Sequence, residues 1–169
     1  MIQPLSAFTS GTIYLDTMIL YTFLRVDAQV RPVLRSFFAR IEQREIIAYT
    51  STLTFDELAY RLLLALIKDN YSGSPLDYLR KNEVKAMAEF YPVLVPQLQH
   101  LRRFPNLRLV NVTAPDVDLM CQFLLDYKLK PRDALHLTAM RVAGCSNLAS
   151  NDHHFDAVPS LTRYAISAL

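Results

Sequence analysis

The chain has 169 residues, of which 51% are hydrophobic and 20% are charged. This composition excludes a disordered chain, since burying so much apolar material offsets the entropy lost on folding, and the length predicts one domain spanning residues 1–169. The 3 glycines exclude a glycine-rich nucleotide-binding loop, and the formal net charge of +2 neither requires nor excludes a polyanionic partner.

Neither export nor membrane insertion is expected from the sequence. Met1–Thr12 lacks a basic start followed by an apolar stretch and a small-residue cleavage site. The longest candidate apolar run, Leu62–Ile67, is far shorter than the roughly 18 residues that a membrane-spanning helix needs. We therefore expect a cytoplasmic protein that does not associate with a membrane.

Strand-like and helix-like patterns alternate along the chain. Short β-branched apolar runs predict strands, and apolar residues three and four apart predict helices. In the first part of the chain the patterns predict a strand at Thr12–Leu15, helices at Met18–Leu24 and Val30–Ile41, a strand at Ile46–Tyr49, and a helix capped by the hydroxyl residues of 50–54. After residue 104 they predict a strand at Leu107–Val112, helices at 114–125 and 131–144, and strands at Asn147–Ser150 and Tyr164–Leu169. Strands separated by helices indicate an α/β fold, with a mostly parallel sheet covered on both faces.

A helical insertion is predicted at residues 69–104. The segment Asp69–Pro75 is rich in turn-forming residues and breaks the preceding helix. Two helical stretches follow, Asp77–Phe90 and Val93–Phe104, and the second ends at Pro105. The insertion either extends the core as a helical hairpin or forms an arm that contacts another molecule.

Four acidic residues fall where predicted strands end or helices begin. Asp16 follows the first strand, Asp152 follows the fourth, Glu57 lies early in the helix after the second, and Asp133 opens the helix after Pro131. Taken singly, each acid has a structural interpretation as a helix cap, a turn residue or the partner of an arginine. Because ligands of open parallel sheets bind at the carboxyl ends of the strands, the four acids together predict a common site.

A cluster of carboxylates favours a bound cation, because like charges held together repel one another. Oxygen ligands select Mg²⁺ or Mn²⁺, and such an ion lowers the pKa of a bound water, so the predicted reaction is phosphodiester hydrolysis. His153 and His154 stand beside Asp152, but 4 histidines scattered along the chain do not supply the fuller ligand set that zinc prefers.

The segments around these acids resemble, in order, the motifs of PIN-domain nucleases, in particular VapC-type toxins. The motifs are Asp16-Thr17 after an apolar strand, Ser51–Leu58 (STLTFDEL), Asp133–Ala139 (DALHLTA) and Ser150–Phe155 (SNDHHF). The resemblance implies that Asp16, Glu57, Asp133 and Asp152 are catalytic metal ligands and that Thr17 and Ser150 line the same pocket.

The resemblance also implies a PIN-like three-layer α/β/α fold, Mg²⁺- or Mn²⁺-dependent endoribonuclease activity, and a homodimer neutralised by a small antitoxin protein. In that case the insertion at 69–104 would grip RNA or the antitoxin, if it does more than extend the core. One residue departs from the motifs. Met18 stands where the family often has Ser or Asn, which removes an auxiliary hydrogen bond and no metal ligand.

Basic residues near these segments are candidates for RNA binding. Arg102, Arg103 and Arg132 could contact phosphates around the acids, although a solvated helix face explains such residues as well. His136, three residues after Asp133, is interpreted as a packed or hydrogen-bonded histidine rather than a general base.

Two other functions fit part of the pattern. The first is a non-catalytic PIN-like module that binds metal or RNA. The second is a phosphotransfer domain, which also places an Asp after the first strand. Such phosphatases usually carry a second Asp two residues later, where this chain has Met18, so the pattern favours the nuclease.

Overall fold

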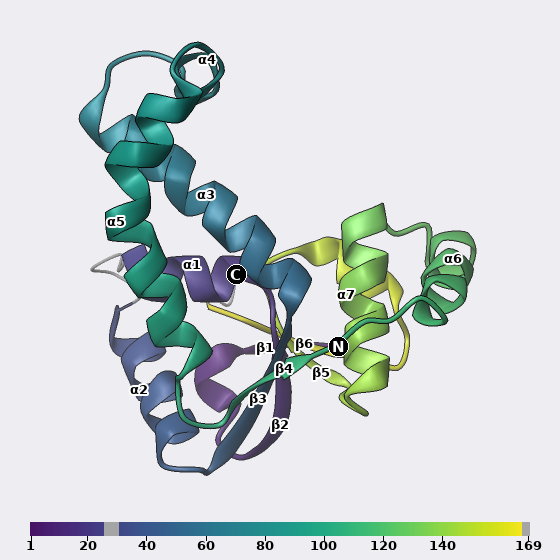
Figure 1. Ribbon diagram of the computed structural model, residues 1–169. Coiled ribbons are helices and arrows are strands. Elements are labelled where there is room, and N and C mark those ends of the chain that lie inside the picture. The colour runs from purple at the N-terminus through teal and green to yellow at the C-terminus, as the bar shows by residue number, and fades with distance from the viewer. Residues whose placement is uncertain (26–30, 167–169) are drawn as a thin grey trace.

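A computed structural model describes residues 1–25 and 31–166, whose arrangement is shown in Figure 1. Within these ranges the strands form one six-stranded sheet in the order β1-β6-β5-β2-β3-β4, and every neighbouring pair is parallel. The strands are β1 Ile2–Pro4, β2 Gly11–Leu15, β3 Ile46–Ser51, β4 Leu107–Val110, β5 Asn147–Ala149 and β6 Thr162–Ala165. The predicted parallel sheet is confirmed.

Helices cover both faces of the sheet. They are α1 Thr17–Arg25, α2 Arg31–Glu42, α3 Thr52–Asn70, α4 Pro75–Lys81, α5 Glu83–Arg102, α6 Asp116–Tyr127 and α7 Pro131–Val142, with short 3-10 helices η1 Leu5–Ala7 and η2 His153–Ala157. Helices α1, α2, α3 and α5 share one core with Ile13 and Leu15 of β2, whereas α6 and α7 share a second core with Tyr14. This alternation of side chains along β2 produces the predicted three layers.

The helices α3 and α5 extend beyond the sheet. In Figure 1 they run away from the strands together, with α4 at their far end. Leu62 and Ile67 of α3 and Phe90 and Leu94 of α5 are buried in the same core, so this pair is held by packed apolar side chains. No helix in the described ranges has the length and apolar character needed to cross a membrane.

The helix boundaries in the insertion differ from the prediction. The break falls at Asn82, and α5 continues through Pro92 and Pro96, where the sequence predicts an end after Phe90. Each proline removes one backbone hydrogen bond, which normally bends or ends a helix. Burial of Phe90 and Leu94 on either side offsets that loss, so tertiary packing overrides the local signal.

The outer strands were only partly predictable. Strand β1 was not predicted, because its three residues are too few to show an alternating apolar pattern. It forms by pairing with β6, in which Arg163 lies opposite Ile2. Strand β6 begins at Thr162, two residues before the predicted start. Ser167–Leu169 of that predicted strand and Val30 of a predicted helix lie outside the described residues.

Candidate active site

The predicted site lies at the carboxyl ends of the central strands. The chain continues from β2 to β3 on one side, whereas β5 pairs with β2 on the other, so the strand order reverses at this point. Asp16 directly follows β2, and its backbone N–H donates to the Ala149 carbonyl at the end of β5 (3.1 Å). Crevices at such reversals are where open parallel sheets bind ligands.

Hydrogen bonds through Ser150 join Asp16 to Asp152. Ser150 Oγ donates to Asp16 Oδ2 at 2.6 Å and accepts from the Asp152 backbone N–H at 3.0 Å. Ser150 and Asp16 are both buried. The structure therefore places Ser150 between two of the predicted acids, where it fixes their relative position.

The start of α3 positions Glu57. Ser51 is the N-cap, and its hydroxyl accepts from the Thr54 backbone N–H while the Thr54 hydroxyl accepts from the Ser51 N–H. Because Ser51 is also the last residue of β3, the cap fixes α3 to the carboxyl end of that strand. Glu57 then lies in the second turn of α3 and is buried.

The carboxylate of Glu57 is held by three donors. Its Oε2 accepts from Thr17 Oγ1 at 2.5 Å and from His136 Nε2 at 3.1 Å, and Arg132 lies 3.2 Å from Oε1. Burial alone would raise the pKa of Glu57, but the hydrogen bonds from His136 and Thr17 and the nearby positive charge lower it to about 2. Glu57 is therefore an anion at neutral pH.

Asp133 presents a different environment in the first turn of α7. Its Oδ2 atom is buried and has no hydrogen-bond partner within the described residues. Burial, and after it the negative charge of Asp152, raise the pKa of Asp133 above its ordinary value. Burying a carboxylate oxygen without a hydrogen-bond donor costs folding free energy. The position of this atom therefore suits the binding of a metal cation.

Sequence reasoning did not find the part played by Tyr14. The hydroxyl of Tyr14 lies 3.0 Å from Ser51 Oγ and 3.0 Å from His136 Nδ1, while His136 Nε2 faces Glu57 and, at 3.9 Å, Asp16 Oδ1. Tyr14 and His136 are buried, as the interpretation of His136 as a hydrogen-bonded histidine requires. Tyr14 sits in an apolar strand pattern, and only the pairing of that strand with β3 places it here.

Asp152 is half-buried and caps η2. Its Oδ1 accepts from the backbone N–H of His154 at 2.9 Å and contacts the His154 ring at 2.5 Å. Partial burial raises the pKa of Asp152, but these bonds outweigh it and lower the value below the ordinary one. Within the described residues, Asp152, His153 and His154 form the one group of three ligating side chains whose atoms all lie within 4.8 Å of one another.

The basic residues predicted to bind RNA are divided between two places. Arg132 lies at the site and reaches Glu57, and its side chain is 66% exposed. Arg102 ends α5, and Arg103 follows it, only a few residues before β4 begins. Arg102 and Arg103 therefore lie near the amino ends of the parallel strands, whereas Asp16 lies at their carboxyl ends. The two arginines do not adjoin the acids.

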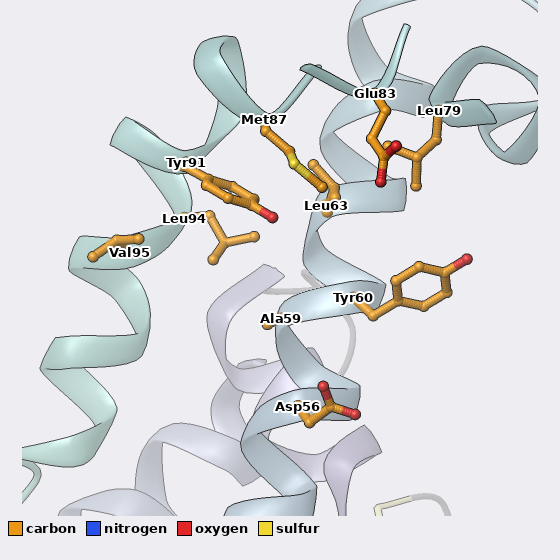
Figure 2. Close-up of a pocket in the computed structure, with 10 residues that line it drawn as sticks. All are labelled: Asp56, Ala59, Tyr60, Leu63, Leu79, Glu83, Met87, Tyr91, Leu94 and Val95. Atoms are coloured by element: carbon orange, nitrogen blue, oxygen red, sulfur yellow. The ribbon is translucent and has the colours of Figure 1, made fainter. Parts of the chain in front are cut away.

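An apolar pocket of about 290 Å³ lies between α3, α4 and α5 (Figure 2). Leu63 and Leu94 are part of its lining, and Asp56 and Glu83 are the charged residues in that lining. The pocket contains no basic lining residue, so it does not suit a negatively charged ligand.

Solved structures share this fold. VapBC2 from Rickettsia felis, bound to a DNA fragment from their promoter, matches with a TM-score of 0.59 and 13% identity, over 92% of this chain and 98% of that chain. FitAB bound to the IR36 DNA fragment matches with a TM-score of 0.53 and 16% identity, over 93% of this chain and 96% of that chain. At such low identities the likeness concerns the fold.

The sequence itself carries the family assignment. No curated protein matches the chain. The family model described as PIN domain matches residues 13–161, a range that includes Asp16, Glu57, Asp133 and Asp152. The match spans most of the chain, and the reversal of strand order and the solved structures agree with it. The chain therefore belongs to the PIN domain family.

Proposed function

We propose that this protein is a metal-dependent endoribonuclease that hydrolyses RNA phosphodiester bonds, with Mg²⁺ or Mn²⁺ held by Asp16, Glu57, Asp133 and Asp152. One observation carries the proposal. Acids from four separate segments converge on one end of the sheet, and a buried oxygen of Asp133 has no donor within the described residues. PIN domains are generally nucleases, which agrees with this arrangement.

The donor set fits a hard divalent cation. All four side chains offer carboxylate oxygens, which are the ligands that Mg²⁺ and Mn²⁺ prefer. Burial, and after it the negative charges of Asp152 and Asp16, raise the pKa of Asp133, and a cation would relieve this repulsion. Zinc is disfavoured, because the four proposed ligands are all carboxylates, whereas zinc sites prefer a fuller set of His and Cys ligands.

The protein's own side chains contribute to the reaction by positioning the carboxylates and by neutralising the charge of a substrate phosphate. Thr17 and His136 hold the Glu57 carboxylate, and Ser150 holds the Asp16 carboxylate, so that neither side chain needs to reorganise during the reaction. Arg132 is exposed at the mouth of the site, where it can contact a substrate phosphate. A bound divalent ion would supply an activated water and stabilise charge on the phosphate oxygens.

We further propose that the chain is the toxin of a VapBC-type pair, acting in the cytoplasm as a homodimer and inhibited by a small antitoxin. The shared fold with VapBC2 and FitAB supports this role. We also propose that residues 1–169 form a single PIN domain and that 69–104 is an insertion that extends α3. The continuous apolar core between α3 and α5 supports this division.

Cleavage of a mixed cellular RNA pool tests the activity. We expect cleavage with Mg²⁺ or Mn²⁺, none with EDTA, and a loss of at least about 100-fold in Asp16→Asn and Asp133→Asn, since both remove a ligand without changing side-chain shape. Asp126→Asn is the matched control, because Asp126 is an exposed acid on α6. Wild-type protein that binds Mn²⁺ but leaves RNA intact would support the non-catalytic binding module instead.

A further inference from the structure

A groove of about 410 Å³ runs between α1 and α3. Its lining includes Tyr21 and Arg25 from α1 and Arg61, Lys68 and Asp69 from α3. Arg25 pairs with Asp69 at 2.6 Å, so three cations and one acid line this groove. The groove is therefore lined by basic side chains, which the lining of the pocket in Figure 2 lacks.

The periodicity of α3 aligns this groove with the acids. Arg61 follows Glu57 by four residues and Lys68 follows Arg61 by seven, and both spacings return to nearly the same face of an α-helix. From Glu57 to Lys68 the helix rises about 16 Å, at roughly 1.5 Å per residue. The cations thus form a stripe that begins one turn beyond Glu57 and leads away from the site.

The other face of α3 is occupied differently. Asp56 and Tyr60, labelled in Figure 2, line the apolar pocket and lie on a different face of α3 from the groove residues Arg61 and Lys68. At about 100° of rotation per residue, that face is roughly a third of a turn from the stripe of Arg61 and Lys68. One side of α3 is therefore acidic and apolar, whereas the side in line with Glu57 is basic.

Arg61 also connects the groove to the start of α1. Its Nη1 lies 3.3 Å from the Met18 sulfur, and Met18 is two residues after Asp16. A thioether is a neutral partner, so this contact orients the guanidinium and leaves its charge available to an anion. Arg61 and Lys68 are exposed on the surface of α3.

We infer that the α1–α3 groove binds the phosphate backbone of single-stranded RNA beside the cleavage site, with Arg61 and Lys68 neutralising successive phosphates and Arg25 contributing at the far end. This inference rests on the proposed function, because the basic residues of the groove begin one helical turn beyond Glu57, one of the four acids. It assigns substrate binding to residues other than Arg102 and Arg103, which lie near the amino ends of the strands, away from the acids.

The test measures the affinity of a labelled single-stranded oligoribonucleotide by fluorescence anisotropy in EDTA, from 50 to 200 mM salt. We expect Arg61→Ala/Lys68→Ala to weaken binding at least tenfold and to flatten the slope of log affinity against log salt by about 1.4, or roughly 0.7 for each lost phosphate contact. The matched control, Arg102→Ala/Arg103→Ala, removes the same charge and should leave the slope unchanged. Circular dichroism verifies folding, which alanine at exposed helix positions should preserve.

Cleavage kinetics with Mn²⁺ separate the groove from the chemistry. If wild type cleaves RNA, the groove variant should raise KM and leave kcat within about threefold, because the lost contacts bind substrate and transition state alike. If wild type fails to cleave, the proposed function fails, and anisotropy alone judges the groove. Equal losses in both double variants would show an effect of net charge only and overturn the inference. Unchanged RNA affinity in the groove variant would also overturn the inference, even if the groove bound an acidic peptide.

Discussion

At the scale of single residues, the site depends on donors that keep its carboxylates charged and in place. His136 is central, since its Nε2 faces Glu57 and Asp16 while its Nδ1 lies 3.0 Å from the Tyr14 hydroxyl. Carboxylates only accept hydrogen bonds, so Nε2 must carry a proton. Burial raises the pKa of Tyr14 to about 12, so the phenol stays neutral and remains a hydrogen-bond donor at neutral pH.

Replacing His136 with Leu should destabilise the metal-free protein. Glu57 would lose a donor while still buried, and removing a hydrogen bond to a buried charge costs about 2 kcal/mol. The free energy of unfolding of His136→Leu at pH 7, measured by urea denaturation, should fall by about that amount. His136→Gln should lose less, because its amide retains a donor and an acceptor.

The same contact has a defined pH dependence. The pKa of Glu57 is lowered in the folded state, to about 2 from an ordinary 4.5, so its ionised form stabilises the fold. This contribution is complete above pH 4.5 and is lost as the pH falls toward 2. The difference between wild type and His136→Leu should therefore shrink over that range. A difference that stayed constant from pH 7 to pH 3 would contradict the assigned role of His136.

The sequence predicted where the four acids lie and that Thr17 and Ser150 lie beside them, but it did not predict the contacts of Tyr14. Asp16 and Asp152 follow apolar strands, and the carboxyl ends of parallel strands must lie on one edge of a sheet. Tyr14 gives no such signal, because a tyrosine in a buried strand is most simply a core residue. Its polar contacts depend on which strand pairs with β2 and on the cap of α3, and neither is encoded locally.

At the scale of secondary-structure elements, α5 shows where local propensity fails. Pro92 and Pro96 are exposed, yet the helix continues through both, because Phe90 and Leu94 pack into the core shared with α3. The sequence predicts strands and helices well where apolar periodicity and hydroxyl caps agree, as at α3. It predicts a break between Phe90 and Val93, beside Pro92, because the contacts that compensate for the proline are tertiary and leave no local signal.

Substituting Pro92 with Ala should stabilise the protein. The replacement restores a backbone N–H inside α5, and proline in a helix interior costs about 3 kcal/mol relative to alanine, partly offset by the greater freedom of the unfolded chain. We expect a net gain of about 1 to 2 kcal/mol by denaturant unfolding. Val93→Ala, at the next exposed position, is a control for helix propensity alone and should gain no more than about 0.7 kcal/mol. A Pro92→Ala variant no more stable than wild type would mean that α5 already bends around the proline without cost.

At the scale of the whole molecule, the site joins parts of the chain that are far apart in sequence. Asp16 and Ser150 are 134 residues apart, and their hydrogen bond connects β2 to the loop after β5. Arg163 of β6 supports that loop from behind, since its guanidinium is 4% exposed and donates to the Ser150 carbonyl at 3.2 Å and to Asp156 at 2.8 Å. The loop that carries Asp152 is thus fixed both to the end of β2 at the centre of the sheet and to β6, the strand next to the edge strand β1.

The most direct test of this assembly is calorimetric titration of Mn²⁺ into wild type and into Asp16→Asn, Glu57→Gln, Asp133→Asn and Asp152→Asn, with Asp126→Asn and His153→Ala as controls. If the four acids form one metal site, each of the four variants weakens Mn²⁺ binding at least about tenfold, and both controls bind as wild type does. Wild-type affinity in the Asp16 and Asp133 variants, with binding lost only in Asp152→Asn and His153→Ala, would place the ion on Asp152, His153 and His154 and contradict a shared site.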